Sequence, residues 1–176
     1  MIYPKPLTKN STIGIAAPSD GRTDKLNLIR LDNAYTQLKK LGYNIKETNS
    51  VRNSINGRST TAQNRAHELE ELYNNKDINI IISASGGDYM MEILPYLNFN
   101  IIKNNPKWFC GYSDNTNLGF ILPTKYDIAS IYGDHINAFG MSKWHQSINN
   151  YLSILTGNII PQKSFNKYQR GSFYNI

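Results

Sequence analysis

The chain has 176 residues, of which 40% are hydrophobic and 18% are charged, and its formal net charge is +6. This length is sufficient for one globular domain with a hydrophobic core of ordinary size. The basic surplus is spread along the sequence and forms no run of Lys and Arg interleaved with aromatic residues, so we expect no nucleic-acid partner.

The sequence also indicates a cellular compartment. The first residues, Met1 to Pro6, lack the apolar segment of a signal peptide. No apolar run approaches the length of a membrane span. Cys110 is the single cysteine, so no internal disulfide can form, which fits a reducing environment. We therefore expect a cytoplasmic protein with no membrane partner.

The first half of the chain predicts strands that alternate with helices. Small apolar residues open it, as is typical of a buried parallel strand. Leucines at helical spacing follow, and Gly42 suits the position after a helix C-terminus. The predicted elements are a strand at 12–17, a helix at 24–41, a strand at 43–48, a polar loop at 49–59 and a helix that Ser59 or Thr60 caps and that ends before 74.

The second half continues the alternation. Its first strand, from Ile78 to Ala84, is the strongest strand signal in the chain. The further elements are a helix from about 90 to 97, a strand from 108, a helix that ends before Pro123 or Thr124, a strand at 128–132 and a helix at 144–155. Residues 156–176 have no clear period. We therefore expect an α/β domain at 1–155, followed by a linker or the start of another domain at 156–176.

This order predicts βαβ units, which form a parallel sheet with helices on both faces, as in flavodoxin-like and Rossmann-like domains. Functional groups in such sheets gather at the carboxyl ends of the strands. Two candidates follow predicted strands there. They are Gly86-Gly87 and Ser113.

Ser113 lies in a stretch that predicts a strand, a sharp turn and a helix. Bulky apolar residues precede Gly111-Tyr112-Ser113-Asp114, and polar residues typical of a helix start follow. A nucleophile elbow has this arrangement. Its usual last glycine is replaced by Asn115, which tolerates a positive φ better than most residues. Taken alone, these residues also fit the more common case of a serine N-cap on an ordinary helix.

Other residues have simpler explanations. Cys110 could act as a nucleophile, but a cysteine within an apolar strand usually behaves as a small hydrophobe. His135 could act as a base, although a structural or substrate-facing histidine is the more common case. Asp114 suits the positive end of a helix dipole. Gly86-Gly87 could cradle a phosphate, but the remainder of a nucleotide-binding fingerprint is missing.

Several short motifs together resemble one family. They are Thr12 to Ser19, Ser85-Gly86-Gly87, Leu94 to Phe99, Asn105-Pro106-Lys107, Gly111 to Asp114, Gly133-Asp134-His135 and Phe139-Gly140-Met141. Their order and spacing over about residues 12–141 resemble the LD-carboxypeptidase family of serine peptidases. The Phe-Gly-Met ending is closer to the branch that contains the microcin C immunity peptidase.

The resemblance implies a chemistry. Ser113 would be the nucleophile, and the backbone N–H groups of Gly87 and Asp114 would form the oxyanion hole. Family members hydrolyse an amide beside a free carboxylate through an acyl-enzyme, without a metal or organic cofactor. The implied substrate is a small peptide, a peptidoglycan fragment or a peptidyl-nucleotide. The N-terminal half of the family is a parallel α/β domain, and a smaller β-rich domain follows it.

The sequence departs from the family in one important respect. The family's catalytic Glu and His belong to the β-rich C-terminal domain, for which we expect no counterpart in residues 1–176. Loss of one triad member lowers the rate by about 10⁴-fold or more. The alternative is therefore a truncated, inactive remnant that acts as a binding or dimerisation module, for example as a homodimer. A flavodoxin-like nucleotide-binding module is a third option. Asn98 replaces a usual Asp, and Asn115 replaces a usual Ile.

Overall fold

The computed structural model describes residues 1–166. Its centre is a five-stranded sheet in the order β2-β1-β3-β4-β5, and all neighbouring strands are parallel. The strands are β1 Thr12–Ala16, β2 Asn44–Glu47, β3 Ile78–Ser83, β4 Trp108–Gly111 and β5 Ile131–Tyr132. The predicted parallel α/β fold is confirmed. The order changes direction between β1 and β3, which places the topological switch point there.

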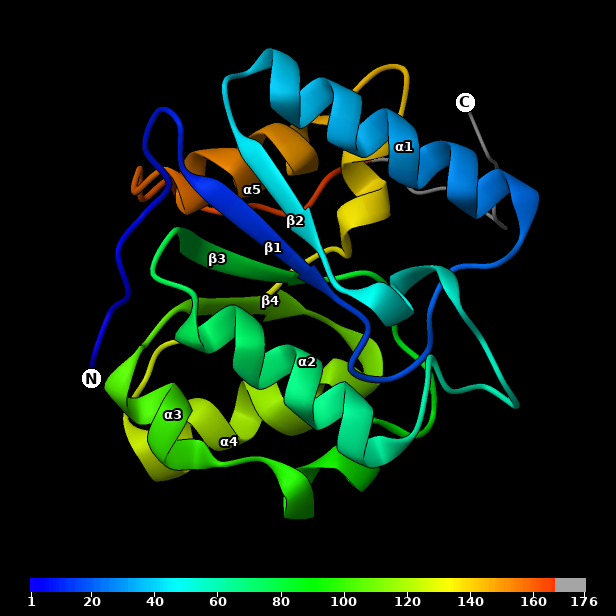
Figure 1. The fold of residues 1–176 in the computed structure, drawn as a ribbon. Coiled ribbons are helices and arrows are strands. Elements are labelled where there is room, and N and C mark those ends of the chain that lie inside the picture. Colours follow the sequence, from blue (N-terminus) through cyan, green and yellow to red (C-terminus); the bar gives the residue numbers. More distant parts are fainter. Residues whose placement is uncertain (167–176) are drawn as a thin grey trace.

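Helices cover both faces of this sheet (Figure 1). The α-helices are α1 Lys25–Lys40, α2 Ala62–Asn74, α3 Phe99–Asn104, α4 Thr116–Tyr126 and α5 Gln146–Leu155. Shorter 3₁₀ helices are η1 Asn49–Arg52, η2 Met90–Tyr96, η3 Ser113–Asn115 and η4 Ile136–Gly140. Helices α1 and α5 lie on one face, and α2, α3 and α4 lie on the other (Figure 1).

The core consists of two apolar clusters, one on each face of the sheet. Strand β3 contributes to both, because Ile80 and Ile82 point toward α1 and α5 while Ile81 points toward α2 and α4. All three side chains are fully buried. Burial on both faces explains why this strand is a continuous run of isoleucines rather than an alternating one.

Helix α4 differs from its prediction, because it continues past Pro123 to Tyr126. A proline inside a helix cannot donate to the carbonyl four residues earlier, which here belongs to Gly119. The hydroxyl of Ser130 donates to that carbonyl at 2.6 Å instead. A side chain from the following segment therefore supplies the missing hydrogen bond and lets the helix continue.

Three further boundaries were predicted wrongly. The helix predicted from about 90 to 97 is the 3₁₀ helix η2, which contains Pro95. Helix α3 lies between η2 and β4, where no element was predicted, and Asn98 caps it by accepting from the N–H of Asn100. Helix α2 is capped by Thr61 rather than Ser59 or Thr60, because the buried Ser59 hydroxyl donates to Ala17 O.

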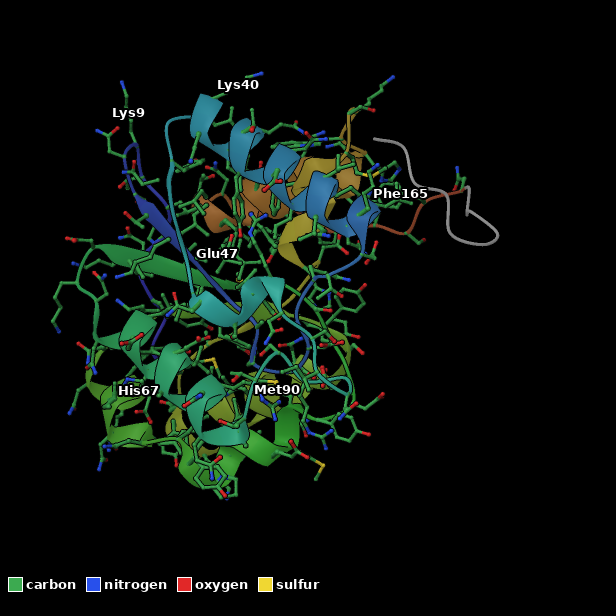
Figure 2. All side chains as sticks on the ribbon, turned by 45° about the vertical axis from the view of Figure 1, so that its right-hand side comes forward. Lys9, Lys40, Glu47, His67, Met90 and Phe165 are labelled. Carbon is green, nitrogen blue, oxygen red and sulfur yellow. The ribbon has the colours of Figure 1, made fainter. Side chains whose placement is uncertain are left out.

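The two rims of the sheet carry different residues. Lys9 and Lys40 lie at the amino-terminal rim, and Met90 lies toward the opposite one (Figure 2). Residues 156–166 extend beside α5, where Asn150 Nδ2 donates to Gln162 Oε1 at 3.3 Å. The rest of the predicted 156–176 segment lies outside the described residues, so the division at 155 stays a prediction. Within residues 1–166, no helix is long and apolar enough to cross a membrane.

Candidate active site

Ser113 lies at a sharp bend, two residues after the end of β4. Its φ is 62°, in a left-handed region that residues other than glycine rarely adopt. The residue is exposed at the carboxyl-terminal rim of the sheet, and its Oγ makes no hydrogen bond to any described residue. We expected Asn115 to tolerate a positive φ, but its φ is −59°. The backbone strain is therefore at the serine itself.

The loop after β3 approaches Ser113 closely because it contains two glycines. A Cβ added to Gly86 would lie 3.0 Å from Ser113 Cβ and 3.2 Å from its Oγ. A Cβ added to Gly87 would overlap the hydroxyl of Ser19. The structure therefore brings two predicted elements together, the glycine pair and the serine. The role of the Gly87 and Asp114 N–H groups as an oxyanion hole stays a prediction.

Asp114 connects the ends of three strands. Asp114 itself follows β4. Its Oδ2 accepts from the hydroxyl of Ser19, a residue that follows β1. The same oxygen accepts from the N–H of Met90, a residue that follows β3, at 3.1 Å. Its Oδ1 is buried and has no hydrogen-bond partner among the described residues. The sequence indicated only that this carboxylate suits a helix start. The contact with Ser19 was missed because it joins residues 95 positions apart.

A second polar group, around Arg65, braces the same loops. Arg65 is 1% exposed. Its Nη1 donates to Pro18 O and to Tyr89 O at 3.0 Å each. Its Nη2 donates to Glu92 Oε2 at 2.7 Å. Sequence reasoning missed Arg65, because a charged residue on an amphipathic helix usually indicates the solvent-exposed side.

Asn115 and His135 fill the space beneath the bend. Asn115 is fully buried, and its Nδ2 donates to Ser85 O at 2.8 Å and to Tyr112 O at 3.2 Å. The same nitrogen lies 3.2 Å from His135 Nε2. His135 stacks on Tyr112 with ring centroids 4.2 Å apart. These contacts support a structural interpretation of His135.

The electrostatics also argue against His135 as a strong base. Burial, together with the positive charge of Arg22, lowers the pKa of His135 to about 4. Its imidazole is therefore neutral near pH 7. A histidine with so low a pKa is a poor acceptor for the proton of a serine hydroxyl, because general bases work best with a pKa near the operating pH.

Cys110 does not compete with Ser113 in this geometry. Its side chain is fully buried in β4, and burial raises the pKa of its thiol to about 12. A buried thiol is not the nucleophilic thiolate form. Among residues 1–166, no three His, Cys, Asp or Glu side chains gather in a group that could hold a metal ion.

Comparison with known proteins places this site in context. Residues 13–133 match the family model of the LD-carboxypeptidase N-terminal domain. The Bacillus subtilis protein YocD, which is named as a carboxypeptidase, is 28% identical over 142 residues, or 81% of this chain and 43% of that protein. The Escherichia coli microcin C7 self-immunity protein MccF is 42% identical over 76 residues, or 43% of this chain and 22% of that protein.

Solved structures agree with the sequence relatives. MccF in complex with aspartyl sulfamoyl adenosine superposes with a TM-score of 0.81 and 30% identity, covering 89% of this chain and 47% of that one. An MccF-like protein from Bacillus anthracis gives a TM-score of 0.79 and 27% identity over the same shares. The chain thus spans less than half the length of these relatives. The match over residues 13–133 shows that the chain belongs to the LD-carboxypeptidase family.

Proposed function

We propose that this chain carries the nucleophile half of a serine hydrolase of the LD-carboxypeptidase and microcin-immunity type. The supporting observation is the state of Ser113, whose hydroxyl is exposed on a left-handed bend against Gly86. Strained, exposed serines at the end of a parallel strand are typical of nucleophile elbows. Family membership makes hydrolysis the chemistry that this geometry serves best.

In the proposed reaction, Ser113 Oγ attacks the carbonyl carbon of an amide that lies next to a free carboxylate. The N–H groups of Gly87 and Asp114 donate to the developing oxyanion. The C–N bond then breaks, and the serine proton reaches the leaving amine through a base. Water hydrolyses the resulting ester and frees Ser113. Because His135 is a weak base, we assign the proton transfer to the family's Glu and His, which lie outside the matched N-terminal region.

The substrate class follows from the relatives. Solved MccF structures hold aspartyl sulfamoyl adenosine and glutamyl sulfamoyl guanosine. Another relative, from Bacillus subtilis, is named as a murein peptide carboxypeptidase and is 28% identical over 130 residues. We therefore propose a small peptide, a peptidoglycan fragment or a peptidyl-nucleotide as the substrate. A module that binds such ligands without cleaving them is the second candidate.

A serine-directed probe tests the proposal. The purified chain is treated with a fluorophosphonate and incubated separately with an LD-dipeptide and an aspartyl-amide. Because the family's Glu and His lie outside the matched region, we expect slow labelling. The label should lie on Ser113, located by peptide mass spectrometry, and Ser113→Ala should abolish labelling and any turnover. Ser142→Ala, at an exposed serine near α5, is the matched control and should label as the wild type does. Labelling that survives Ser113→Ala would contradict the assignment, and a chain that neither labels nor cleaves would favour the binding module.

A further inference from the structure

Arg22 lies in the loop after β1, where its side chain contacts the loop after β3 that contains Gly86. It follows β1, and its backbone N–H donates to Val51 O at 2.7 Å. Its Nε donates to Ala84 O at 2.9 Å, just after β3. The first bond fixes the backbone of Arg22, and the second holds its side chain at the switch point between β1 and β3. Open α/β sheets bind their ligands in this crevice, outside the carboxyl ends of the strands.

The guanidinium of Arg22 is partly buried and has no carboxylate partner. Among residues 1–166 it forms no ion pair, and Nε is the only one of its nitrogens with a hydrogen bond. The neighbouring carboxylates are engaged locally, since Asp20 Oδ1 accepts from Gly21 N at 2.8 Å and Asp24 accepts from Asn27. Burial accordingly lowers the pKa of Arg22.

An unpaired, partly buried guanidinium is a candidate binding site for an anion. Removing a charge from water costs free energy unless an opposite charge or hydrogen-bond acceptors replace the lost hydration. The two free Nη groups present a planar fork that matches the two oxygens of a carboxylate. Lys would offer the charge without this fork.

The same crevice contains Ser113. Ala84, whose carbonyl accepts from Arg22 Nε, lies two residues before Gly86, where an added Cβ would lie 3.0 Å from Ser113 Cβ. The Arg22 charge also lowers the pKa of His135, whose ring stacks on Tyr112, the residue before Ser113. Arg22 and Ser113 therefore flank the same short segment after β3.

We propose that Arg22 is a carboxylate-binding residue, which holds the free carboxylate of the peptide ligand through its Nη groups and so places the adjacent amide at Ser113. The identity of the ligand rests on the proposed function, whereas anion binding itself does not need the serine. Arg22 would then determine specificity for amides that lie next to a free carboxylate.

A pair of matched probes tests this proposal. The ¹⁵N-labelled chain is titrated with N-acetyl-glycyl-D-alanine and, separately, with its C-terminal amide, and dissociation constants are measured by NMR. We expect the free acid to bind at least about tenfold more tightly than the amide, a difference of about 1.4 kcal/mol. Arg22→Gln should remove this preference, and Arg22→Lys should retain part of it. Arg52→Gln, at an exposed arginine paired with Asp32 and Glu47, is the control and should keep the full preference.

Three results would overturn the proposal. They are equal affinity of the wild type for acid and amide, no binding of either, and an unchanged preference in Arg22→Gln. The pKa of His135, followed by NMR, checks that the variant is folded with the charge removed, because it should rise in Arg22→Gln and stay low in Arg22→Lys.

The test separates this subsite from the hydrolase proposal. Ser113→Ala should retain the preference for the acid, since Arg22 is untouched. If the chain neither labels nor cleaves but still prefers the acid through Arg22, the subsite stands and the hydrolase fails. If it cleaves without any effect of Arg22→Gln on KM or on binding, the hydrolase stands and the subsite fails.

Discussion

Replacing Arg65 by Met tests whether one buried cation holds the loops of the candidate site. Arg65 Nη1 donates to Pro18 O and Tyr89 O at 3.0 Å each. Met keeps much of the side-chain volume but leaves both carbonyls without this donor, at a cost of about 1–3 kcal/mol each. Relief from the desolvation of the guanidinium offsets part of this cost. We expect a net loss of about 2–3 kcal/mol in the free energy of unfolding.

Urea unfolding followed by circular dichroism measures this loss, and the melting temperature should fall by about 5–10 °C. Arg58→Met is the matched control, because Arg58 also donates to Glu92 but is partly exposed. Its effect should be much smaller, since pairs in contact with water contribute little. Amide exchange at Met90 should accelerate in Arg65→Met alone. Equal unfolding midpoints for Arg65→Met and the wild type would refute the bracing role.

Two further predictions concern pH and packing. Hydrogen bonds from Arg58, and then from Arg65, lower the pKa of Glu92 to about 2 from its usual 4.5. This contribution to stability is present above about pH 4.5 and is lost as the pH falls toward 2, so Glu92→Gln should flatten the acid side of a pH–stability curve. Gly119→Ala, inside α4, should stabilise by about 0.5–1 kcal/mol in thermal melts, because the added Cβ would lie 3.8 Å from Ser130 Oγ, an ordinary contact distance. Gly140→Ala should destabilise, because its Cβ would overlap Arg30 O, and equal melts for the two variants would contradict this contrast.

The fold could be predicted because its signals are local. Strand β3 is buried on both faces, so its run of isoleucines needs no knowledge of its neighbours. The nearness of Gly86 and Ser113 was also predictable, because consecutive parallel strands end at the same edge of a sheet. Sequence order alone therefore places the glycine pair beside the serine turn.

The remaining features depend on partners that are distant in the sequence. Pro123 predicted a helix end, and only the hydroxyl of Ser130 makes the continued helix acceptable. The hydrogen bond from Ser19 to Asp114 spans 95 positions, and the bond from Arg65 to Tyr89 spans 24. Nothing in the local pattern of these residues distinguishes a buried, bonded side chain from a solvated one. Tertiary contacts determine whether such a side chain is buried or solvated, and these contacts cannot be predicted from the local sequence pattern.

Asn115 explains how the bend at Ser113 persists without the usual last glycine of an elbow. A left-handed serine costs about 1–3 kcal/mol unless its surroundings fix it. Asn115 Nδ2 donates to Ser85 O and Tyr112 O, which joins the exits of β3 and β4 on either side of the bend. Gly111 makes room for this side chain, since a Cβ there would lie 3.0 Å from Asn115 Cβ. The first glycine of the elbow pattern, Gly111, is thus retained, and the amide side chain of Asn115 takes the place of the last one.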